Sequence, residues 1–379
     1  LAGVQVMTAR AVGEGRQGAA GAVLRRGVAY GLWIGVLSSI FLALVGPAFL
    51  HGVGLQPDLA DGASRVLLAF SLSLTPYTLW VAAAMWLEAL SRPRAPMVMM
   101  WIANALNLAI DLVLVPGHFG LPAMGAVGGA CATLGSRSVL MVVIFAYIAR
   151  LPEARAMGVF ERPPRDRPAE IEQRRIGYGS GASNFFEVAA FAAMNIVTGW
   201  LGGAAVAAWT IILNVTSLVF MAPLGFSGAT AVRVGAAYGA RDLGQVNRSA
   251  LLGALITSVM ALGFSLAIWP LATFIAGAYT RDAAVIALAT NGLVMACIFF
   301  LPDALQIVGA QSLRARGDVW PPTLIQMFSY TIVMSPLAWA LAFPAHMGLT
   351  GVMLATIIAS VLSAVLQISR LIWLGRRGL

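Results

Sequence analysis

The sequence predicts an all-α polytopic membrane protein built from two six-helix lobes that are related by an internal repeat. Three observations predict this fold class. Of the 379 residues, 60% are hydrophobic and only 10% are charged, whereas a soluble domain carries about 25% charged residues. Apolar stretches such as 31–50 and 251–276 are long enough to cross a hydrocarbon core of about 30 Å. Finally, the two halves of the chain share the same landmarks.

The apolar runs, divided by Gly, Pro and charged residues, predict ten complete spans after a short N-terminal helix. We expect them near 28–49, 64–91, 95–116, 122–149, 176–201, 204–230, 248–276, 284–314, 319–343 and 348–374. They are expected to be helices, because lipid offers the backbone no hydrogen-bond partners. Since the chain begins at Leu1, inside an apolar helix, we expect the first helix of the fold and part of the second to precede it.

The arginines predict the orientation of the chain. With the first loop in the cytoplasm, nearly all loop arginines fall on the cytoplasmic side, as the positive-inside rule requires. The polar connection 150–175, which holds seven Arg and five acidic residues, falls there too. We therefore expect an N-terminal lobe at 1–150, a cytoplasmic linker at 151–175 and a C-terminal lobe at 176–379 with a cytoplasmic C-terminus. The Arg-only basic complement favours a bacterial protein of the inner membrane.

The repeat appears as matched segments at a nearly constant offset. The segment 11–16 resembles 237–242, and Pro76 corresponds to Pro302, both 226 residues apart. An even number of helices in each half makes the two repeats parallel. Substrate sites of transporters usually lie between such halves, so the architecture favours transport.

Four ionisable side chains are predicted to lie inside spans, where each costs roughly 2.5–3.5 kcal/mol on insertion scales. Two of them, Glu187 and Asp303, each lie eleven residues from the inner end of their helix, which is about 16 Å. At one depth in one lobe, they could share a cavity and bind H⁺ or Na⁺ reversibly. The alternative is that each carboxyl is satisfied separately and only holds helices together.

The other two ionisable groups lie in the N-terminal half. Asp111 follows Asn107 by one helical turn, so both could form a second polar site. Asp111 could equally reach outer water. Arg137 is too deep to reach the surface easily, and we expect it to pair with Asp111 or another acid, either structurally or as a substrate contact.

Candidates for the lining of a substrate cavity flank the acids of the second half. They are Asn184, Phe186, Asn195, Asn214 and Phe299. The asparagines could line the cavity or make helix-to-helix hydrogen bonds. The phenylalanines could offer apolar or cation–π surface to an organic cation.

No sequence feature points to an enzyme. The three His residues fall at predicted outer helix ends, and the chain contains no phosphate-binding glycine loop, HExxH motif or nucleophile elbow. Cys131 and Cys297 lie in apolar segments, so no disulfide framework is expected. The formal charge of +9 resides in short loops, which argues against a nucleic-acid partner. We expect the lipid bilayer and a small organic substrate as partners, no cofactor besides the coupling ion, and a monomer.

Several motifs resemble the multidrug and toxic compound extrusion (MATE) family. They are FFEV at 185–188, MAPLG at 221–225, PDALQ at 302–306 and the glycine–arginine turns near residues 15 and 239. The resemblance implies twelve helices in two lobes and the export of organic, cationic or amphipathic compounds in exchange for Na⁺ or H⁺. It also implies that Glu187 and Asp303 are the cation-coupling carboxylates, and that Na⁺ would bind there.

The resemblance extends to the first half. Asn107, Asp111 and Thr133 resemble the N-lobe ion site of another branch of the family, whose principal acid belongs to the first helix. Trp209-Thr210 and Glu88 depart from the family pattern, where a His-Gln pair and Gln are usual. The alternative function is a flippase for lipid-linked oligosaccharides, which would favour a strongly cationic cavity, whereas Arg137 is the only deep arginine predicted.

Overall fold

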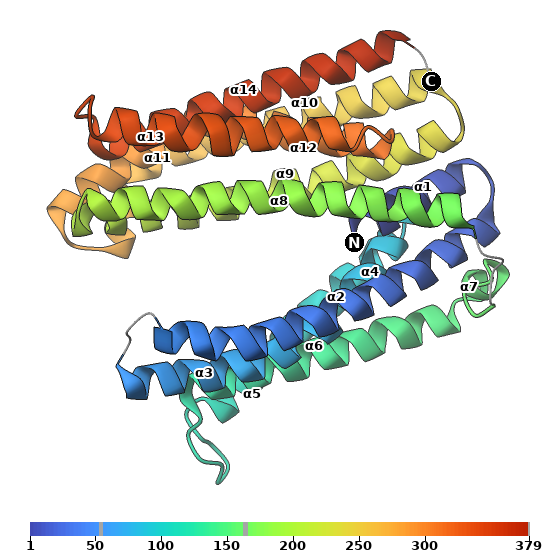
Figure 1. The fold of residues 1–379 in the computed structure, drawn as a ribbon, viewed down its shortest axis with the longest axis horizontal. Coiled ribbons are helices and arrows are strands. Elements are labelled where there is room, and N and C mark those ends of the chain that lie inside the picture. Colours follow the sequence, from blue (N-terminus) through green and yellow to red (C-terminus); the bar gives the residue numbers. More distant parts are fainter. Residues whose placement is uncertain (53–55, 162–165, 378–379) are drawn as a thin grey trace. The chain divides into compact units, whose positions relative to one another are not determined.

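The structure is a computed structural model that describes residues 1–52, 56–161 and 166–377. Within these ranges it consists of helices and turns, without a strand (Figure 1). The chain divides into two compact units, Leu1–Gln173 and Arg174–Leu379. The predicted all-α membrane fold is confirmed.

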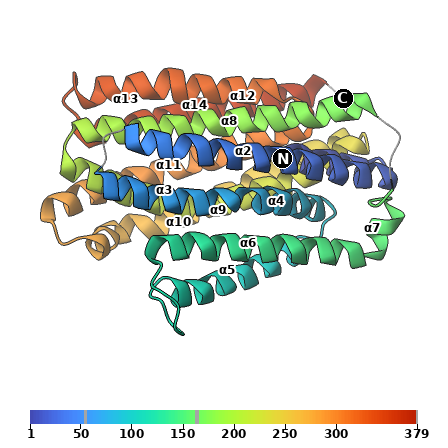
Figure 2. The same cartoon turned by 60° about the horizontal axis from the view of Figure 1, so that its bottom comes forward.

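Unit 1 contains α1 (Ala2–Gly13), α2 (Gln17–Gly52), α3 (Pro57–Leu72), α4 (Leu74–Ala89), α5 (Arg94–Leu114), α6 (Gly125–Arg150), α7 (Pro152–Ala156) and the first residues of α8 (Arg167–Trp200). Unit 2 contains the rest of α8, α9 (Gly203–Gly239), α10 (Leu243–Tyr279), α11 (Ala283–Ala315), α12 (Trp320–Gln326), the π-helix η1 (Met327–Met334), α13 (Ser335–Ala342) and α14 (Gly348–Arg377). In two views, α12, η1 and α13 form one rod along α14 (Figures 1 and 2).

Nine helices of the described chain are long and apolar enough to cross a membrane. Nine of the ten predicted spans match them, with α3 and α4 counted as one span. The tenth is α8, whose first turns are charged and whose middle carries Asn184 and Glu187. Several boundaries were predicted too short, because polar turns continue the same helix beyond the apolar run: α2 begins at Gln17, not near 28.

The predicted repeat is visible in where the helices begin. In unit 1, α2 and α3 begin at Gln17 and Pro57, and in unit 2, α10 and α11 begin at Leu243 and Ala283, each 226 residues later. The helices α2 and α10 also have nearly the same length, 36 and 37 residues, whereas α11 runs unbroken where unit 1 has α3 and α4. The order of the matched helices supports the predicted duplication.

The turns repeat as well. Both α1 and α9 end in a backbone bond that reaches back five residues, from Arg16 N to Ala11 O and from Asp242 N to Ala237 O. This bond closes a helix when the preceding residue adopts a left-handed conformation. Gly15 adopts it at φ +71° and Arg241 at φ +58°. The matched glycine–arginine motifs thus encode the same helix stop twice.

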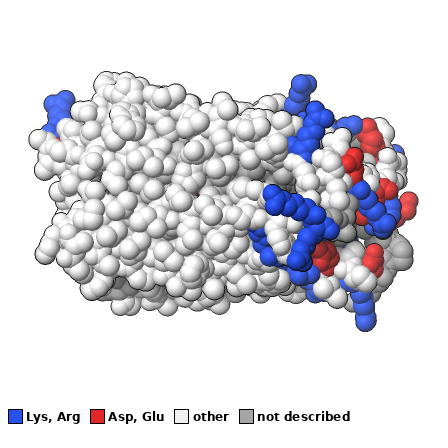
Figure 3. Space-filling model, turned by 90° about the horizontal axis from the view of Figure 1, so that it is seen from above, with Lys and Arg blue, Asp and Glu red and all other residues white. Residues whose placement is uncertain are grey.

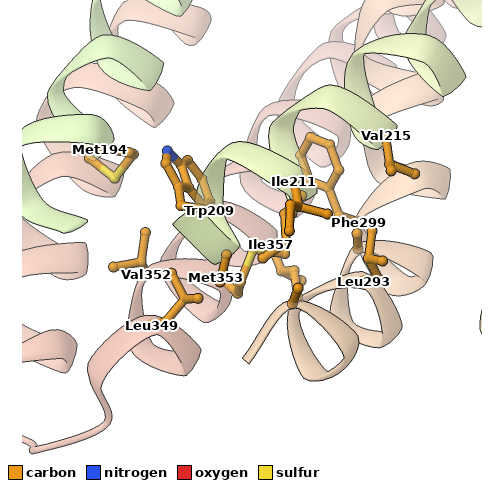
Figure 4. Close-up of a cluster of buried hydrophobic side chains, with 14 of the residues drawn as sticks. Met194, Trp209, Ile211, Val215, Leu293, Phe299, Leu349, Val352, Met353 and Ile357 are labelled. Carbon is orange, nitrogen blue, oxygen red and sulfur yellow. The ribbon is translucent and has the colours of Figure 1, made fainter. Parts of the chain in front are cut away.

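The core of unit 2 lies around α11, which packs against α9, α10 and α14. Figure 4 shows Trp209 and Ile211 of α9 facing Leu293 and Phe299 of α11 and the apolar residues of α14. Unit 1 has its own core, in which buried Trp86 donates its indole N–H to Ala20 O at 2.9 Å. Each unit thus has its own buried centre.

Most charged residues lie near the ends of the helices. On the face drawn in Figure 3, most basic and acidic side chains gather at one end, and the flank between the ends carries almost no charged side chain. Large hydrophobic side chains are exposed on helices of each unit, such as Leu44 on α2 at 71% and Leu266 on α10 at 78%. A soluble protein would bury such groups, so the flank fits a hydrocarbon environment.

Replacing Gly351 with Ala should destabilise unit 2 by about 1–3 kcal/mol, since overpacking is costly. A Cβ at this position would lie 2.7 Å from the backbone carbonyl carbon of Leu341 and would push α13 away from α14. The check is the thermal unfolding midpoint in detergent. Gly263→Ala, where nothing lies within 4 Å, is the control. Equal midpoints for both variants would contradict the packing described here.

Candidate functional site

The two predicted coupling carboxyls meet inside unit 2. Glu187 lies on α8 and Asp303 on α11, and Gln306 lies one turn beyond Asp303. The Gln306 side-chain amide donates to both carboxyls, with Nε2 3.5 Å from Glu187 Oε1 and 3.4 Å from Asp303 Oδ1. One neutral amide thus joins the two acids.

A second amide extends the network to α12. Gln326 Nε2 donates to Glu187 Oε2 at 3.4 Å and to Gln306 Oε1 at 2.9 Å. Its oxygen accepts from Arg314 Nη2 at 3.2 Å, and the same Nη2 donates to Ser183 Oγ at 2.5 Å. We call Ser183, Glu187, Asp303, Gln306, Arg314 and Gln326 the carboxyl network.

Most of the carboxyl network is buried, and Glu187 is half-buried. Asp303, Gln306 and Gln326 are 5%, 0% and 3% exposed. A buried ionisable group is stable in such a place only when it is hydrogen-bonded or paired. The amides supply the bonds, and Arg314, 4% exposed, supplies a positive charge.

Local helix geometry contributes to the site. Asp303 follows Pro302, whose ring nitrogen cannot donate the hydrogen bond expected at that turn of α11. Gln326 is the last residue before the π-helix η1, and π segments occur frequently at functional sites. Asp303 and Gln326 therefore each lie beside an irregularity in a helix.

Sequence reasoning missed Gln306, Gln326 and the burial of Arg314. Gln306 could have been found, because it lies three residues after Asp303 and shares its helix face. Arg314 was counted with the arginines of the loops, and the structure places it inside the bundle instead. Its length allows the guanidinium to turn inward from the end of α11.

The predicted N-lobe site assembles in part. With the Asn107 amide turned so that its nitrogen faces the carboxylate, Nδ2 donates to Asp111 Oδ2 at 3.3 Å and Oδ1 accepts from Thr133 N at 3.2 Å. Asp111 Oδ1 is buried without a hydrogen-bond partner among the described residues. Asn107, Asp111 and Thr133 thus lie together between α5 and α6.

Arg137 does not pair with an acid in the described part of the chain, so that expectation was wrong. Its Nη1 donates to Ser73 Oγ at 2.8 Å, at the break between α3 and α4. Its guanidinium carbon lies 5.0 Å from the Phe70 ring centre and 4.6 Å from that of Tyr77. Cation–π contacts replace the carboxylate, because the α3–α4 break presents both rings to α6.

The five cavity candidates lie in different local environments. Asn184 and Asn195 are exposed on α8, and Phe186 is half-buried. Asn214 accepts a hydrogen bond from Tyr279 OH at 2.6 Å. Phe299 is 3% exposed in the apolar core, where it packs against protein rather than facing a cavity.

The structure shows the surroundings of the three residues that depart from the MATE pattern. Trp209 is 1% exposed and fills the core of unit 2, while Thr210 is exposed and bonds to its own helix. Glu88 accepts a hydrogen bond from Gln5 Nε2 at 3.0 Å. Neither site touches the carboxyl network.

A duplicated bundle of membrane-spanning helices with buried carboxyls in one unit defines a membrane transport protein. A family model described as MatE matches residues 1–113 and 180–340. The chain belongs to this family of transporters, as the sequence motifs predicted, and is not an enzyme.

Curated relatives cover most of the chain. It is 53% identical over 364 residues to "Probable multidrug resistance protein NorM" of Caulobacter vibrioides, covering 96% of this chain and 77% of the relative. It is 33% identical to the protein of the same name from Rhizobium meliloti, covering 91% and 75%.

Among solved structures, a multidrug resistance MATE family transporter in an outward-facing conformation has a TM-score of 0.89 at 21% identity, covering 99% of this chain and 82% of that chain. A MOP superfamily transporter from Pyrococcus furiosus has a TM-score of 0.88 at 20% identity, with the same coverage. At this identity the two structures support the fold.

Gln306→Leu should weaken cation binding to the carboxyl network by at least about tenfold, because it removes the amide that joins the two acids. The measurement is the rise in thermal midpoint on addition of Na⁺ or acid, since a ligand stabilises the state that binds it. Thr257→Val, a buried change that lies on α10, is the control. An unchanged midpoint rise in Gln306→Leu would exclude this amide from the site.

Proposed function

We propose that this protein is a secondary active antiporter that exports organic, cationic or amphipathic compounds in exchange for Na⁺ or H⁺. The observation that carries the proposal is the pair of carboxyls, half-buried Glu187 and buried Asp303, that share the Gln306 amide. The printed names of the NorM relatives support multidrug export.

The charges of the carboxyl network explain how it would bind a cation. When both acids are ionised, two negative charges face the single guanidinium of Arg314, so the network attracts a monovalent cation. The low dielectric of a buried site strengthens this attraction. A carboxylate can accept H⁺ or coordinate Na⁺ with its oxygens, so the same two acids suit either ion.

Antiport requires that cation and substrate exclude one another. A cation held in the carboxyl network removes the negative charge that would attract an organic cation, and its departure restores that charge. Alternating access between the lobes would couple these events. We propose lobes at 1–150 and 176–379 with 151–175 as their linker, and no cofactor besides the ion.

Orientation follows from the arginines. We propose a bacterial inner-membrane protein whose linker and C-terminus lie in the cytoplasm, because positively charged loops are retained there. A monomer suffices for this mechanism, since the network lies within one unit. The second ion site would be Asn107, Asp111 and Thr133, with Asp111 Oδ1 available to a ligand.

Export should depend on both carboxyls. In proteoliposomes bearing the full-length protein, imposed H⁺ and Na⁺ gradients are tested separately for ethidium efflux. Glu187→Gln and Asp303→Asn should each reduce gradient-driven efflux at least about tenfold, because each removes an ionisable group that binds the cation. The gradient that drives efflux by the wild type identifies the coupling ion as H⁺ or Na⁺.

Glu153→Gln is the matched control for these variants, since Glu153 is an acid at the surface that pairs with Arg92. Its efflux should equal that of the wild type. Unchanged efflux in both carboxyl variants would refute the proposal. Transport of a fluorescent lipid-linked sugar in place of ethidium would favour the flippase.

A further inference from the structure

A continuous line of buried polar side chains runs along one face of α14. Thr356, Ser360, Ser363 and Gln367 recur every three or four residues, which puts them on one side of the helix. They are 3%, 0%, 0% and 0% exposed. We call these four residues the α14 polar stripe.

One end of the stripe lies next to the carboxyl network. Tyr330 of η1 is fully buried, and its OH lies 3.4 Å from Ser360 Oγ. Tyr330 follows Gln326, whose Nε2 donates to Glu187, by four residues, which is about one helical turn. Tyr330 therefore connects the acids to the stripe.

The stripe continues away from the acids between α14 and α11. Gln367 Nε2 donates to Ser363 Oγ at 3.2 Å. The helices approach closely there, since a Cβ on Gly309 would lie 3.2 Å from Gln367 Cβ. Three residues beyond Gly309, Ser312 is 0% exposed on α11.

The far end of the stripe reaches the helix ends. Arg370 follows Gln367 by three residues and bonds to Asp318, in the turn after α11, with Nε–Oδ2 at 2.5 Å and Nη2–Oδ1 at 2.9 Å. From Ser360 to Arg370 is ten residues, or about 15 Å along α14. The stripe thus spans the distance between the acids and the charged end of unit 2.

Several polar atoms along this line have unused hydrogen-bonding capacity. Gln367 Oε1, Ser312 Oγ and Ser329 Oγ are buried and make no hydrogen bond within the described residues. They belong to α14, α11 and η1, and both α11 and η1 pack against α14. Buried oxygens of this kind are satisfied by water or by a cation.

A second set of polar side chains leads away from the two acids, but a cation could not pass along it. Between α8, α11 and α12, the Arg314 guanidinium lies directly behind Gln326 and Ser183. Arginine stays charged in proteins, and a fixed positive charge in a narrow passage excludes cations. At the end of the α14 polar stripe, by contrast, the charge of Arg370 is balanced by two bonds to the Asp318 carboxylate. The α14 polar stripe presents neutral hydroxyl and amide groups instead.

We infer that the coupling cation passes between the Glu187–Asp303 pair and the charged end of unit 2 along the α14 polar stripe, with the Arg370–Asp318 pair at its mouth. The inference rests on the proposed antiport. It assigns a transport role to Ser360, Ser363 and Gln367, which line the passage without holding the cation at rest. A proton would move through the hydroxyls and bridging water, and Na⁺ would move between the oxygens.

The first test separates binding from passage in the full-length protein. The double variant Ser363→Ala, Gln367→Leu should slow cation-driven ethidium efflux at least tenfold, under whichever gradient drives the wild type. The rise in thermal midpoint on cation addition should stay at the wild-type value, because the acids are unchanged. If the double variant exports ethidium at the wild-type rate, the inference is overturned. It is also overturned if the cation no longer raises the thermal midpoint of the double variant, since Ser363 and Gln367 would then belong to the binding site.

The second test is independent of transport. In a background of Cys131→Ser and Cys297→Ala, Ser363→Cys should react with a small cationic methanethiosulfonate at least ten times faster than Ala359→Cys. Ala359 is equally buried on the same helix, at 0% exposure, but lies in the apolar core. Equal protection of both cysteines overturns the inference. If the wild type shows no cation-driven efflux, the antiport proposal fails. The difference in labelling rate between Ser363→Cys and Ala359→Cys then decides by itself whether a cation can pass along the α14 polar stripe.

Discussion

Two carboxyls can remain inside a membrane-spanning bundle only if other side chains satisfy them, and here Gln306 hydrogen bonds to both. The cost of an unsatisfied ionisable group in a low dielectric is large, so this amide determines how α8 and α11 are arranged. Gln326 brings α12 into the same network. The apolar core of α9, α11 and α14 adjoins the network, and its low dielectric strengthens the interactions of the buried charges.

The carboxyl network combines side-chain amides, whose hydrogen bonds can rearrange, with an arginine whose charge is permanent. Side-chain amides donate and accept, so Gln306 and Gln326 can rearrange when an acid gains or loses a cation. Arg314 cannot lose its charge and holds Ser183 and Gln326 together. The π-helix that follows Gln326 and the proline before Asp303 place irregular, deformable helix geometry beside the ion-binding groups. Such a site can bind an ion and transmit the change to its helices.

The duplicated backbone carries different chemistry in its two units. At the repeat offset of 226 residues, Asp303 corresponds to Tyr77 and Arg314 to Glu88. Tyr77 packs against Arg137, so the first unit uses a cation between aromatic rings where the second uses an acid among amides. Helix starts and turns are preserved, because they satisfy the backbone. The interior side chains are free to diverge, and this divergence gives each unit its own site.

The sequence by itself determined the helical membrane fold and the repeat, and it singled out Glu187 and Asp303 as ionisable residues inside apolar helices. Hydropathy, helix-ending turns and the rise per residue are local properties that do not depend on which helices are neighbours. Only the tertiary structure decided the partners: Gln326 beside Glu187, Arg314 turned inward, Arg137 over Phe70 and Tyr77, and Phe299 in the core rather than in a cavity. These depend on the rotation and packing of each helix against others far along the chain, and no periodicity within one helix specifies which neighbour its polar face meets.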